Sequence, residues 1–510
     1  MKRILPLLLC ILLLLGCRAE DSAYTPTGKG FYVEGQEATE AQSATDEDDQ
    51  FLVLPYYPDR SLNPFICTDF TNRTLFSLVY QGLFSVDKNY QTEPILCSRY
   101  TMSEDMKVYT FYVENATFSD GSHVTVADVL ASYQAARDGK MYGGRLSHVS
   151  EISLSEDGGV IFQLDTAMEN LPILLDIPIV RAEDVAAETP IGSGPYCFEN
   201  TSSGLRLRRR EDWWCRSDLM VTSSSVGLQP VESVLQTRDE FEFSDVSLVC
   251  TDPCSDSYVD YRCDYELWNC ENGIMLYLAC NMESKVFSNA GIRSALTYAI
   301  DREGISNTFY GGFAQPASLP ASPSSPYYST QLAEKFTFDQ QKLSQAIAEA
   351  GYTGKEIEFL VNRDDTMRLR VARQIAQVLT DCGLTVTMLE VSNTRYHQHL
   401  LYSTYDLYLG QTQLSANMDL SPFFRSYGTL RYGGLPDAAL YASCQQALAN
   451  SGNYYNLHET VMKDGRLCPI LFHSYSIHAT RGMLTGLAPA RDNIFHYSLG
   501  KTMADALILQ

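Results

Sequence analysis

Tyr109–Tyr133 (YTFYVENATFSDGSHVTVADVLASY) contains the patterns of a strand, a tight turn and a helix in direct succession. Its first residues alternate in a way that predicts a strand with one buried face. Asp120 and the glycine after it are typical of a tight turn, because glycine adopts positive φ without steric cost. Thr125 and Asp128 have the spacing of a capping box, and Gly139 is placed to end the helix that they begin. The stretch indicates a mixture of strands and helices.

The same mixture continues along the chain without a fixed repeat length. Strand patterns occupy 51–57, 160–165, 191–198 and 405–413, and helical patterns occupy 71–83, 289–305 and 369–382. Such alternation predicts an α/β chain and excludes solenoids and propellers, which repeat at a constant period.

Several of these stretches resemble, in order, the large extracytoplasmic solute-binding proteins of ABC importers, family 5, which bind oligopeptides, dipeptides or nickel. The segments that carry the resemblance are Leu62–Asp87, Tyr109–Tyr133, Pro190–Phe198, Cys280–Ile305, Phe338–Tyr352 and Leu379–Gly410. The resemblance covers about residues 51–500. It implies a type II periplasmic-binding-protein-like α/β fold, with two lobes joined by a hinge and an additional inserted domain.

Carrying the order of the family's segments across gives the domain boundaries. Residues 51–81, 188–272 and 491–510 would form lobe I, residues 82–187 the inserted domain II, and residues 273–490 lobe II. Two lobes that close on a ligand function through a binding equilibrium, in which the ligand stabilises the closed form.

The resemblance also implies a peptide site between the lobes. Peptide-binding relatives hold an extended peptide by main-chain hydrogen bonds, as an added strand. The matching residues are Thr68, Asp69 and Phe70 from lobe I, Gly410, Gln411, Thr412 and Gln413 from lobe II, and Tyr142 after the inserted domain's helix. An aspartate that pairs with the ligand's α-amino group corresponds here to Asn417 or to Asp419. If Asn417 takes this place, the charge-assisted bond weakens, which would favour blocked peptides or non-peptide solutes.

The N-terminus has the pattern of a lipoprotein signal. Positive charge at Lys2 and Arg3 precedes an apolar stretch that is too short for a bilayer span of about 20 residues. The stretch ends at Gly16 and Cys17, which resembles a bacterial lipobox and implies a signal peptide over 1–16 and a lipid on Cys17. A plain signal peptide with a chance cysteine is the alternative. Residues 17–50 contain a long apolar-poor stretch, which predicts a flexible spacer.

Composition limits the partners. A formal net charge of −24 over 510 residues argues against nucleic acid and anionic membrane surfaces, because both require basic patches. We expect a monomer that binds a peptide or another small solute and delivers it to an ABC permease, anchored on the extracytoplasmic face of the cell membrane. Binding of a nickel chelate, haem or an oligosaccharide, and a tethered sensor or adhesion protein without transport, remain open.

Cysteine and histidine patterns give weaker indications. Fourteen cysteines are many, and the group Cys250, Cys254, Cys263, Cys270 and Cys280 makes one or two disulfides plausible in an exported protein. The sequence CTDPC lacks the spacing of a structural zinc site. Two histidine pairs, His397 with His399 on a supposed strand face and His473 with His478, lack a carboxylate at useful spacing, so we expect no metal and no cofactor. Signatures of phosphate loops, nucleophile elbows and metalloproteases are absent, which argues against an enzyme.

Overall fold

The computed structural model describes residues 31–32, 52–215, 224–255, 260–481, 484–485, 487, 489–491, 493–495 and 508–509. The predicted signal peptide, Cys17 and all but two residues of the predicted spacer lie outside the described residues. Those two, Phe31–Tyr32, form β1 and pair in parallel with Glu266 and Leu267, so this short piece is an exception to the predicted spacer.

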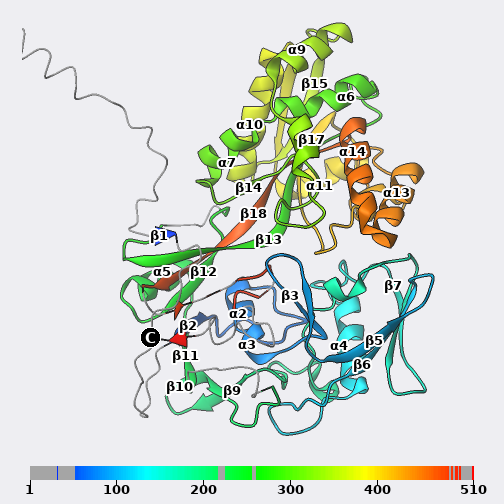
Figure 1. The fold of residues 1–510 in the computed structure, drawn as a ribbon. Coiled ribbons are helices and arrows are strands. Elements are labelled where there is room, and N and C mark those ends of the chain that lie inside the picture. The colour runs from blue at the N-terminus through cyan, green and yellow to red at the C-terminus, as the bar shows by residue number, and fades with distance from the viewer. Residues whose placement is uncertain are drawn as a thin grey trace, which may run out of the picture.

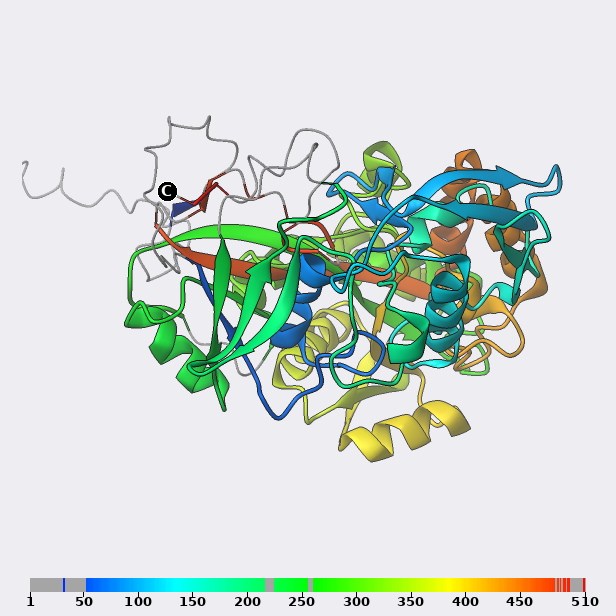
Figure 2. The same ribbon diagram turned by 90° about the horizontal axis from the view of Figure 1, so that it is seen from below.

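Two long antiparallel strands, β13 (Tyr265–Cys280) and β18 (Leu467–Thr480), run through the middle of the molecule and connect its two halves (Figures 1 and 2). They belong to a sheet with the order β12-β18-β13-β17-β15-β16. Its other strands are β12 (Leu248–Thr251), β17 (Leu407–Gln413), β15 (Glu356–Asn362), β16 (Thr385–Val391), β1 and β14 (Gln315–Pro316).

The upper half of the molecule in Figure 1 contains β15, β16, β17 and the adjoining parts of β13 and β18. It also contains the helices that lie between β13 and β18 in the sequence. The α-helices are α6 (Ala290–Ala295), α7 (Arg302–Tyr310), α8 (Thr330–Ala333), α9 (Gln340–Glu349), α10 (Thr366–Asp381), α11 (Asn393–Tyr402), α12 (Ser421–Phe424), α13 (Ala438–Ala449) and α14 (Tyr454–Asp464). The 3₁₀ helices are η3 (Leu296–Ala299), η4 (Glu334–Phe336) and η5 (Ser451–Asn453).

The lower half contains two four-stranded sheets and a hairpin (Figure 1). One sheet has the order β2-β11-β10-β9, with β2 (Val53–Tyr56), β11 (Ser225–Pro230), β10 (Gly204–Arg209) and β9 (Tyr196–Thr201). The other has the order β5-β6-β8-β7, with β5 (Cys97–Met102), β6 (Val108–Val113), β8 (Val160–Leu164) and β7 (Val149–Leu154). The hairpin is β3 (Phe84–Val86) with β4 (Thr92–Pro94), and the helices are α2 (Phe70–Thr74), α3 (Phe76–Val79), α4 (Val126–Asp138), α5 (Val234–Glu242), η1 (Leu171–Leu174) and η2 (Ala182–Asp184). Near the C-terminus, β19 (Leu484–Thr485) pairs with β20 (Ile508–Leu509).

The opening stretch folds as its sequence predicts. Helix α4 has the capping box of Thr125 and Asp128, and Gly139 is its C-cap. The adjacent strand β6 buries Tyr109 and Phe111, whose rings lie 5.8 Å apart. Local sequence decides this unit because its cap, its turn and its buried face all favour the same structure.

Three predictions about helices are wrong in detail. The helix expected over 71–83 is two short helices, α2 and α3, and the cap is Asp69, which accepts a hydrogen bond from the Asn72 amide. The helix expected over 289–305 breaks at Ile300, where the backbone is extended, and Asp301 caps the next helix, α7. His397 and His399 lie in α11 and not on a strand. In the first two cases tertiary packing overrides a pattern that covers only a few turns.

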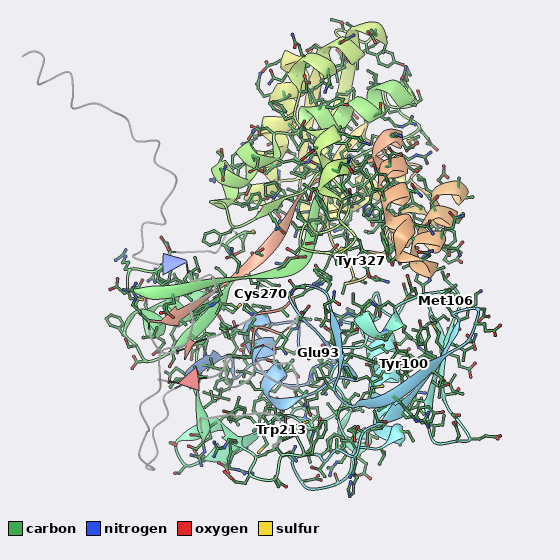
Figure 3. All side chains as sticks on the ribbon, in the orientation of Figure 1. Glu93, Tyr100, Met106, Trp213, Cys270 and Tyr327 are labelled. Atoms are coloured by element: carbon green, nitrogen blue, oxygen red, sulfur yellow. The ribbon has the colours of Figure 1, made fainter. Side chains whose placement is uncertain are left out.

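The described cysteines are free thiols, so the expected disulfides among Cys250, Cys254, Cys263, Cys270 and Cys280 are not present. Cys250 lies on β12 and Cys270 on β13, and β18 runs between these two strands. Two strand spacings of about 4.8 Å separate the backbones further than the roughly 7 Å that a disulfide can bridge. Figure 3 labels Cys270 on β13, where its Sγ donates to the Ala490 carbonyl.

Among the described residues, no helix has both the length and the apolar character that crossing a bilayer requires.

Candidate ligand-binding site

A group of adjoining cavities lies at the boundary between the two halves. One cavity of about 850 Å³ is lined by Lys140, Met141, Tyr142, Gly144 and Arg145 from the lower half and by Thr412, Gln413, Leu414, Ser415, Asp419 and Pro422 from the upper half. A second of about 830 Å³ and a third of about 370 Å³ share wall residues with the first, among them Arg73 and Arg491. We call these three cavities the cleft.

The end of β17 forms the upper wall of the cleft. One edge of the strand pairs with β13, through Ile274 with Gln413 and Met275 with Thr412. On the other edge β15 pairs only with Leu407 and Tyr408, so the described strands leave the rest of that edge open. An open strand edge beside a cavity can accept an extended peptide by main-chain hydrogen bonds.

The four predicted residues of β17 divide into two pairs. Thr412 and Gln413 line the cleft. Gly410 is buried against the Tyr277 ring, and a Cβ atom there would lie 2.4 Å from that ring. Gly410 therefore allows the ring to pack closely under the strand, while Gln411, opposite Leu276, is not among the residues lining the described cavities.

The residues predicted from lobe I lie around the start of α2. Phe70 lines the cleft and stacks on Tyr475 of β18, with ring centroids 3.6 Å apart. The carboxylate of Asp69 caps α2, and Thr68 is exposed outside the described cavities. Tyr142 is buried in the wall of the cleft, where the Arg145 guanidinium lies 5.5 Å from its ring centroid.

Asp419 and Asn417 lie in different environments. Asp419 lines the cleft, whereas Asn417 is buried and its amide nitrogen faces Met168 Sδ at 4.0 Å. The Asn417 carbonyl accepts a hydrogen bond from the Tyr454 hydroxyl. Of the two side chains, Asp419 is therefore the one in reach of a molecule in the cleft.

A buried histidine connects the halves at this aspartate. His148 of the lower half lies 3.1 Å from Asp419 through Nε2 and 2.8 Å from Asp165 through Nδ1. Burial lowers the pKa of His148, but the hydrogen bonds and charges of the two carboxylates outweigh it and raise the pKa above its usual value. Burial raises the pKa of Asp419, and His148 and the Ser421 amide outweigh it and lower the pKa. When His148 is protonated, its charge attracts the carboxylates of both halves and joins the halves electrostatically. We call the three groups the His148 clasp.

Further contacts cross the same boundary. The Glu169 amide of the lower half donates to the Leu448 carbonyl at 2.8 Å, and the Ser451 amide of the upper half donates to the Glu169 carboxylate at 2.7 Å. Figure 3 shows Tyr327 of the upper half and Met106 of the lower half on either side of this boundary. The halves thus touch directly beside the cleft.

Positive charge gathers in the cleft. Among the described residues that line it, the cations are Arg73, Lys140, Arg145 and Arg491, and the anions are Asp176 and Asp419. Arg145 forms an ion pair with Asp176, Asp419 is held by His148, and Arg491 donates to the Leu414 carbonyl. The local excess of cations contrasts with a chain of net charge −24. Low-dielectric walls strengthen such a field and favour an anionic ligand.

Sequence reasoning missed these basic residues. Arg73 lies one helical turn after Phe70, and Arg145 lies three residues after Tyr142, so both follow positions that the resemblance selects. Arg491 comes from the far end of the chain, and His148 pairs with a residue 271 positions later. For Arg73 and Arg145, closeness in sequence to the selected residues was a signal. For Arg491 and His148, the sequence contained no such signal.

Comparisons with known proteins agree with this geometry. Residues 91–433 match the family of bacterial extracellular solute-binding proteins, family 5, in its middle region. The glutathione-binding protein GsiB of Escherichia coli K12 is 26% identical over 314 residues, 57% of this chain and 59% of that protein. The chain thus spans about three fifths of the length of the curated relatives that it matches.

Solved structures share the fold. HbpA2 from Haemophilus parasuis superimposes with a TM-score of 0.73 at 18% identity, covering 90% of this chain and 99% of the other. The ABC transporter substrate-binding protein CtaP from Listeria monocytogenes gives 0.71 at 18% identity, covering 89% and 98%. The predicted fold class, an α/β fold of the type II periplasmic-binding-protein kind, is confirmed.

The family match covers most of the chain and most of the two halves that form the cleft. It assigns the molecule to proteins that bind solutes and not to enzymes. The chain belongs to the bacterial extracellular solute-binding proteins, family 5.

Proposed function

We propose that this chain is an exported, lipid-anchored binding protein that captures short anionic peptides in its cleft and delivers them to an ABC permease. The upper half would act as lobe II (residues 273–490). The lower half would act as lobe I (51–81, 188–272 and 491–510) together with the inserted domain (82–187). Closing the two on the ligand is the functional step.

The cleft supports a peptide as the ligand. The open edge of β17 offers main-chain donors and acceptors next to a cavity, which is the arrangement that added-strand recognition uses. Asp419 would meet a ligand's amino group if the ligand competes with His148, and its position in the wall of the cleft supports this role. Phe70 and Tyr142 add aromatic walls.

The basic residues of the cleft carry the proposal that the peptide is anionic. Arg73, Arg145 and Arg491 line the same cavities, and guanidinium groups bind carboxylates in a bidentate, charge-assisted manner. Glutathione, which the relative GsiB binds, is a tripeptide with two carboxylates, so it has this chemistry. A C-terminal carboxylate or an acidic side chain would supply the same groups.

The lipid anchor rests on the sequence around Cys17. Two or three acyl chains there would hold the protein at the membrane stably, whereas one chain would not. A binding protein fixed at the extracytoplasmic face stays close to a permease in the same membrane, which raises its effective concentration there. In a Cys17→Ala variant we expect the protein to leave the membrane fraction.

Calorimetric titration of the full-length lipoprotein in detergent tests the ligand class. We expect binding of tripeptides with two carboxylates and at least about 10-fold weaker binding of the same peptides with amidated C-termini, since a charge-assisted hydrogen bond contributes about 1.5–3 kcal/mol. Arg73→Gln should weaken binding by about 10- to 100-fold for the same reason. Arg373→Gln is the matched control, because this exposed arginine pairs with Glu390 and neither residue lines the cleft.

Native mass spectrometry of the purified protein identifies what it retains. Masses of short peptides with acidic groups support the proposal. A bound metal chelate, haem or neutral oligosaccharide, or equal affinity for free and amidated peptides, would contradict it. If the protein binds peptides but their uptake does not depend on a permease, a sensor role is favoured.

A further inference from the structure

A cluster of three metal-ligating side chains lies outside the cleft, where the chain leaves β12 and runs beside β18. Asp252, Cys254 and His473 each offer one ligand atom, and these three atoms lie within 4.8 Å of one another. We propose that this cluster is a buried zinc site formed by the Asp252 carboxylate, the Cys254 thiolate and the His473 imidazole.

Strand pairing explains why residues so far apart in sequence meet. β12 is antiparallel to β18, with Thr251 opposite Ser476. Continuing this register past the end of β12 brings Cys254 opposite His473. The Asp252 carboxylate turns back to accept the Cys254 amide at 2.9 Å, which places its oxygens beside the thiol.

The ligand types suit zinc. Thiolate, imidazole and carboxylate are its three usual protein ligands, at about 2.0–2.3 Å, and a mixed set of them selects against the oxygen-preferring Mg²⁺ and Ca²⁺. One thiolate and one carboxylate neutralise the double charge of the ion, so the loaded site is neutral inside the protein. Three protein ligands leave the fourth tetrahedral position to water or a small anion.

The surroundings provide a second, independent observation. His473 is 4% exposed, and its Nε2 has no hydrogen-bond partner among the described residues. A buried imidazole nitrogen without a partner costs free energy, and a metal ion would remove this cost. Cys254 is 6% exposed and belongs to an apolar cluster, which excludes competing water.

Neighbouring groups close the site without competing for the ion. The Tyr310 ring of α7 packs on His473 with centroids 5.5 Å apart. Asp365, the N-cap of α10, is engaged by Arg368 at 2.6 Å. The residues that the sequence grouped with Cys254 and His473 do not contribute to the site. Cys250 is not in the cluster, and His478 packs against Tyr261 and Tyr265.

The position of the cluster gives such an ion a structural consequence. β18 is one of the two long strands that connect the halves, and the chain after β12 approaches it from the adjacent strand (Figure 1). A zinc ion would join this segment to β18 beside the connection. This role is separate from the cleft and does not depend on the identity of the solute.

Cobalt substitution of the full-length protein tests the site. The protein is treated with a chelator, dialysed and titrated with Co²⁺ alone, and Zn²⁺ affinity follows from competition with a chromophoric chelator. We expect one Co²⁺ per chain with a thiolate-to-cobalt charge-transfer band in the near ultraviolet, and its displacement by Zn²⁺. Cys254→Ser should abolish the band. His473→Gln and Asp252→Asn should weaken binding by more than about 100-fold, because even changes behind a ligand cost 10- to 100-fold.

Matched controls separate this site from other thiols and imidazoles. Cys382→Ser and His458→Gln remove a free buried cysteine and a buried histidine from places where no such cluster exists among the described residues. Both should keep the wild-type spectrum. A wild-type protein without the charge-transfer band, or a band that survives Cys254→Ser, would overturn the proposal. If Cys254→Ser fails to fold, unchanged Co²⁺ affinity in the near-isosteric Asp252→Asn would overturn it equally.

Discussion

Arginine has two different roles in this molecule, one in the core of the upper half and one in the cleft. Arg302 is buried and donates to the carbonyls of Ala317 and Pro469, both at 2.9 Å, and to the Phe336 carbonyl at 3.0 Å. Burial lowers its pKa to about 10, so the side chain stays charged at neutral pH. Its partners are backbone carbonyls of the protein and the Thr297 hydroxyl, to which it donates at 2.9 Å.

Arg73, in contrast, is half-buried on a helix of five residues and lines all three cavities of the cleft. Arg145 and Arg491 also face this space, where Arg145 pairs with Asp176 and Arg491 donates to the Leu414 carbonyl. The difference indicates that the core arginine specifies the fold, whereas the cleft arginines face the space that a ligand would occupy. Charge alone does not separate the two; burial and the identity of the acceptors do.

The largest expected effect is on the core side of this comparison. Arg302→Met should lower the free energy of unfolding by about 3–5 kcal/mol, because several buried carbonyls lose their donor at once. Urea unfolding measures the change. The ligand affinity of the protein that remains folded should stay within about twofold of the wild-type value. A loss of affinity without a loss of stability would contradict the role of Arg302 in the fold.

The next effect concerns the cleft. Arg73→Lys keeps the charge but loses the planar, bidentate guanidinium, so we expect ligand affinity to fall by about 3- to 10-fold, less than for Arg73→Gln. Calorimetry gives the affinity and thermal unfolding gives the stability. Equal losses for the Lys and Gln variants would show that shape matters and charge does not.

A third prediction concerns the pH dependence of a titratable contact between the halves, the His148 clasp. The raised pKa of His148 contributes stability that is fully present below its unfolded pKa of about 6.5 and is lost as pH rises through the folded value. The lowered pKa of Asp419 contributes stability that is present above about pH 3.9 and is lost as pH falls through its folded value. The clasp is therefore strongest between about pH 4 and 6.5.

Urea unfolding at pH 5.5 and pH 9 tests the clasp. Between these values the wild type should lose more unfolding free energy than His148→Gln does, because only the wild type loses the charge on His148. His458→Gln is the control, since burial lowers the pKa of His458 to about 3 and keeps it neutral at both values. Parallel pH profiles for wild type and His148→Gln would rule out the clasp.

The smallest effect is expected at the surface. Arg373 pairs with Glu390 at 2.8 Å, and the Arg373 side chain is exposed to solvent while that of Glu390 is partly exposed. Because solvent and salt screen such a pair, Arg373→Gln should change neither the unfolding midpoint nor ligand affinity measurably. A clear loss of either would remove it as a reference for the other variants.

Sequence reasoning predicted much of the scaffold and less of the site. The unit from β6 to α4 follows from local signals, because the cap, the turn and the alternating strand agree. The helices around Asp69 and Asp301 did not. The apolar pattern over 71–83 continues past the end of α2 at Thr74, and Asp301 caps a new helix inside the pattern over 289–305. The expected disulfides are absent, and for Cys250 on β12 and Cys270 on β13 the reason is topological, because β18 separates these two strands.

In the site, the residues found by resemblance are those on regular elements or next to them. Thr412, Gln413, Phe70, Tyr142 and Asp419 line the cleft. The cations beside them, and the partner of His148, come from segments that no local pattern connects. The metal-ligating cluster is the clearest case. Neither the sequence around Cys254 nor the sequence around His473 has the spacing of a metal site, and only strand pairing brings the two residues together.

The sequence by itself determined the α/β class, the family resemblance and the lipobox pattern, because these depend on local order along the chain: periodicity, caps, turns and short motifs. The tertiary structure alone decided where the charges gather, which arginines are buried in the core and which line the cleft, and which thiol meets which imidazole. Those properties depend on distances between residues hundreds of positions apart. Such distances are set by how the two long strands join the halves, and no local pattern records them.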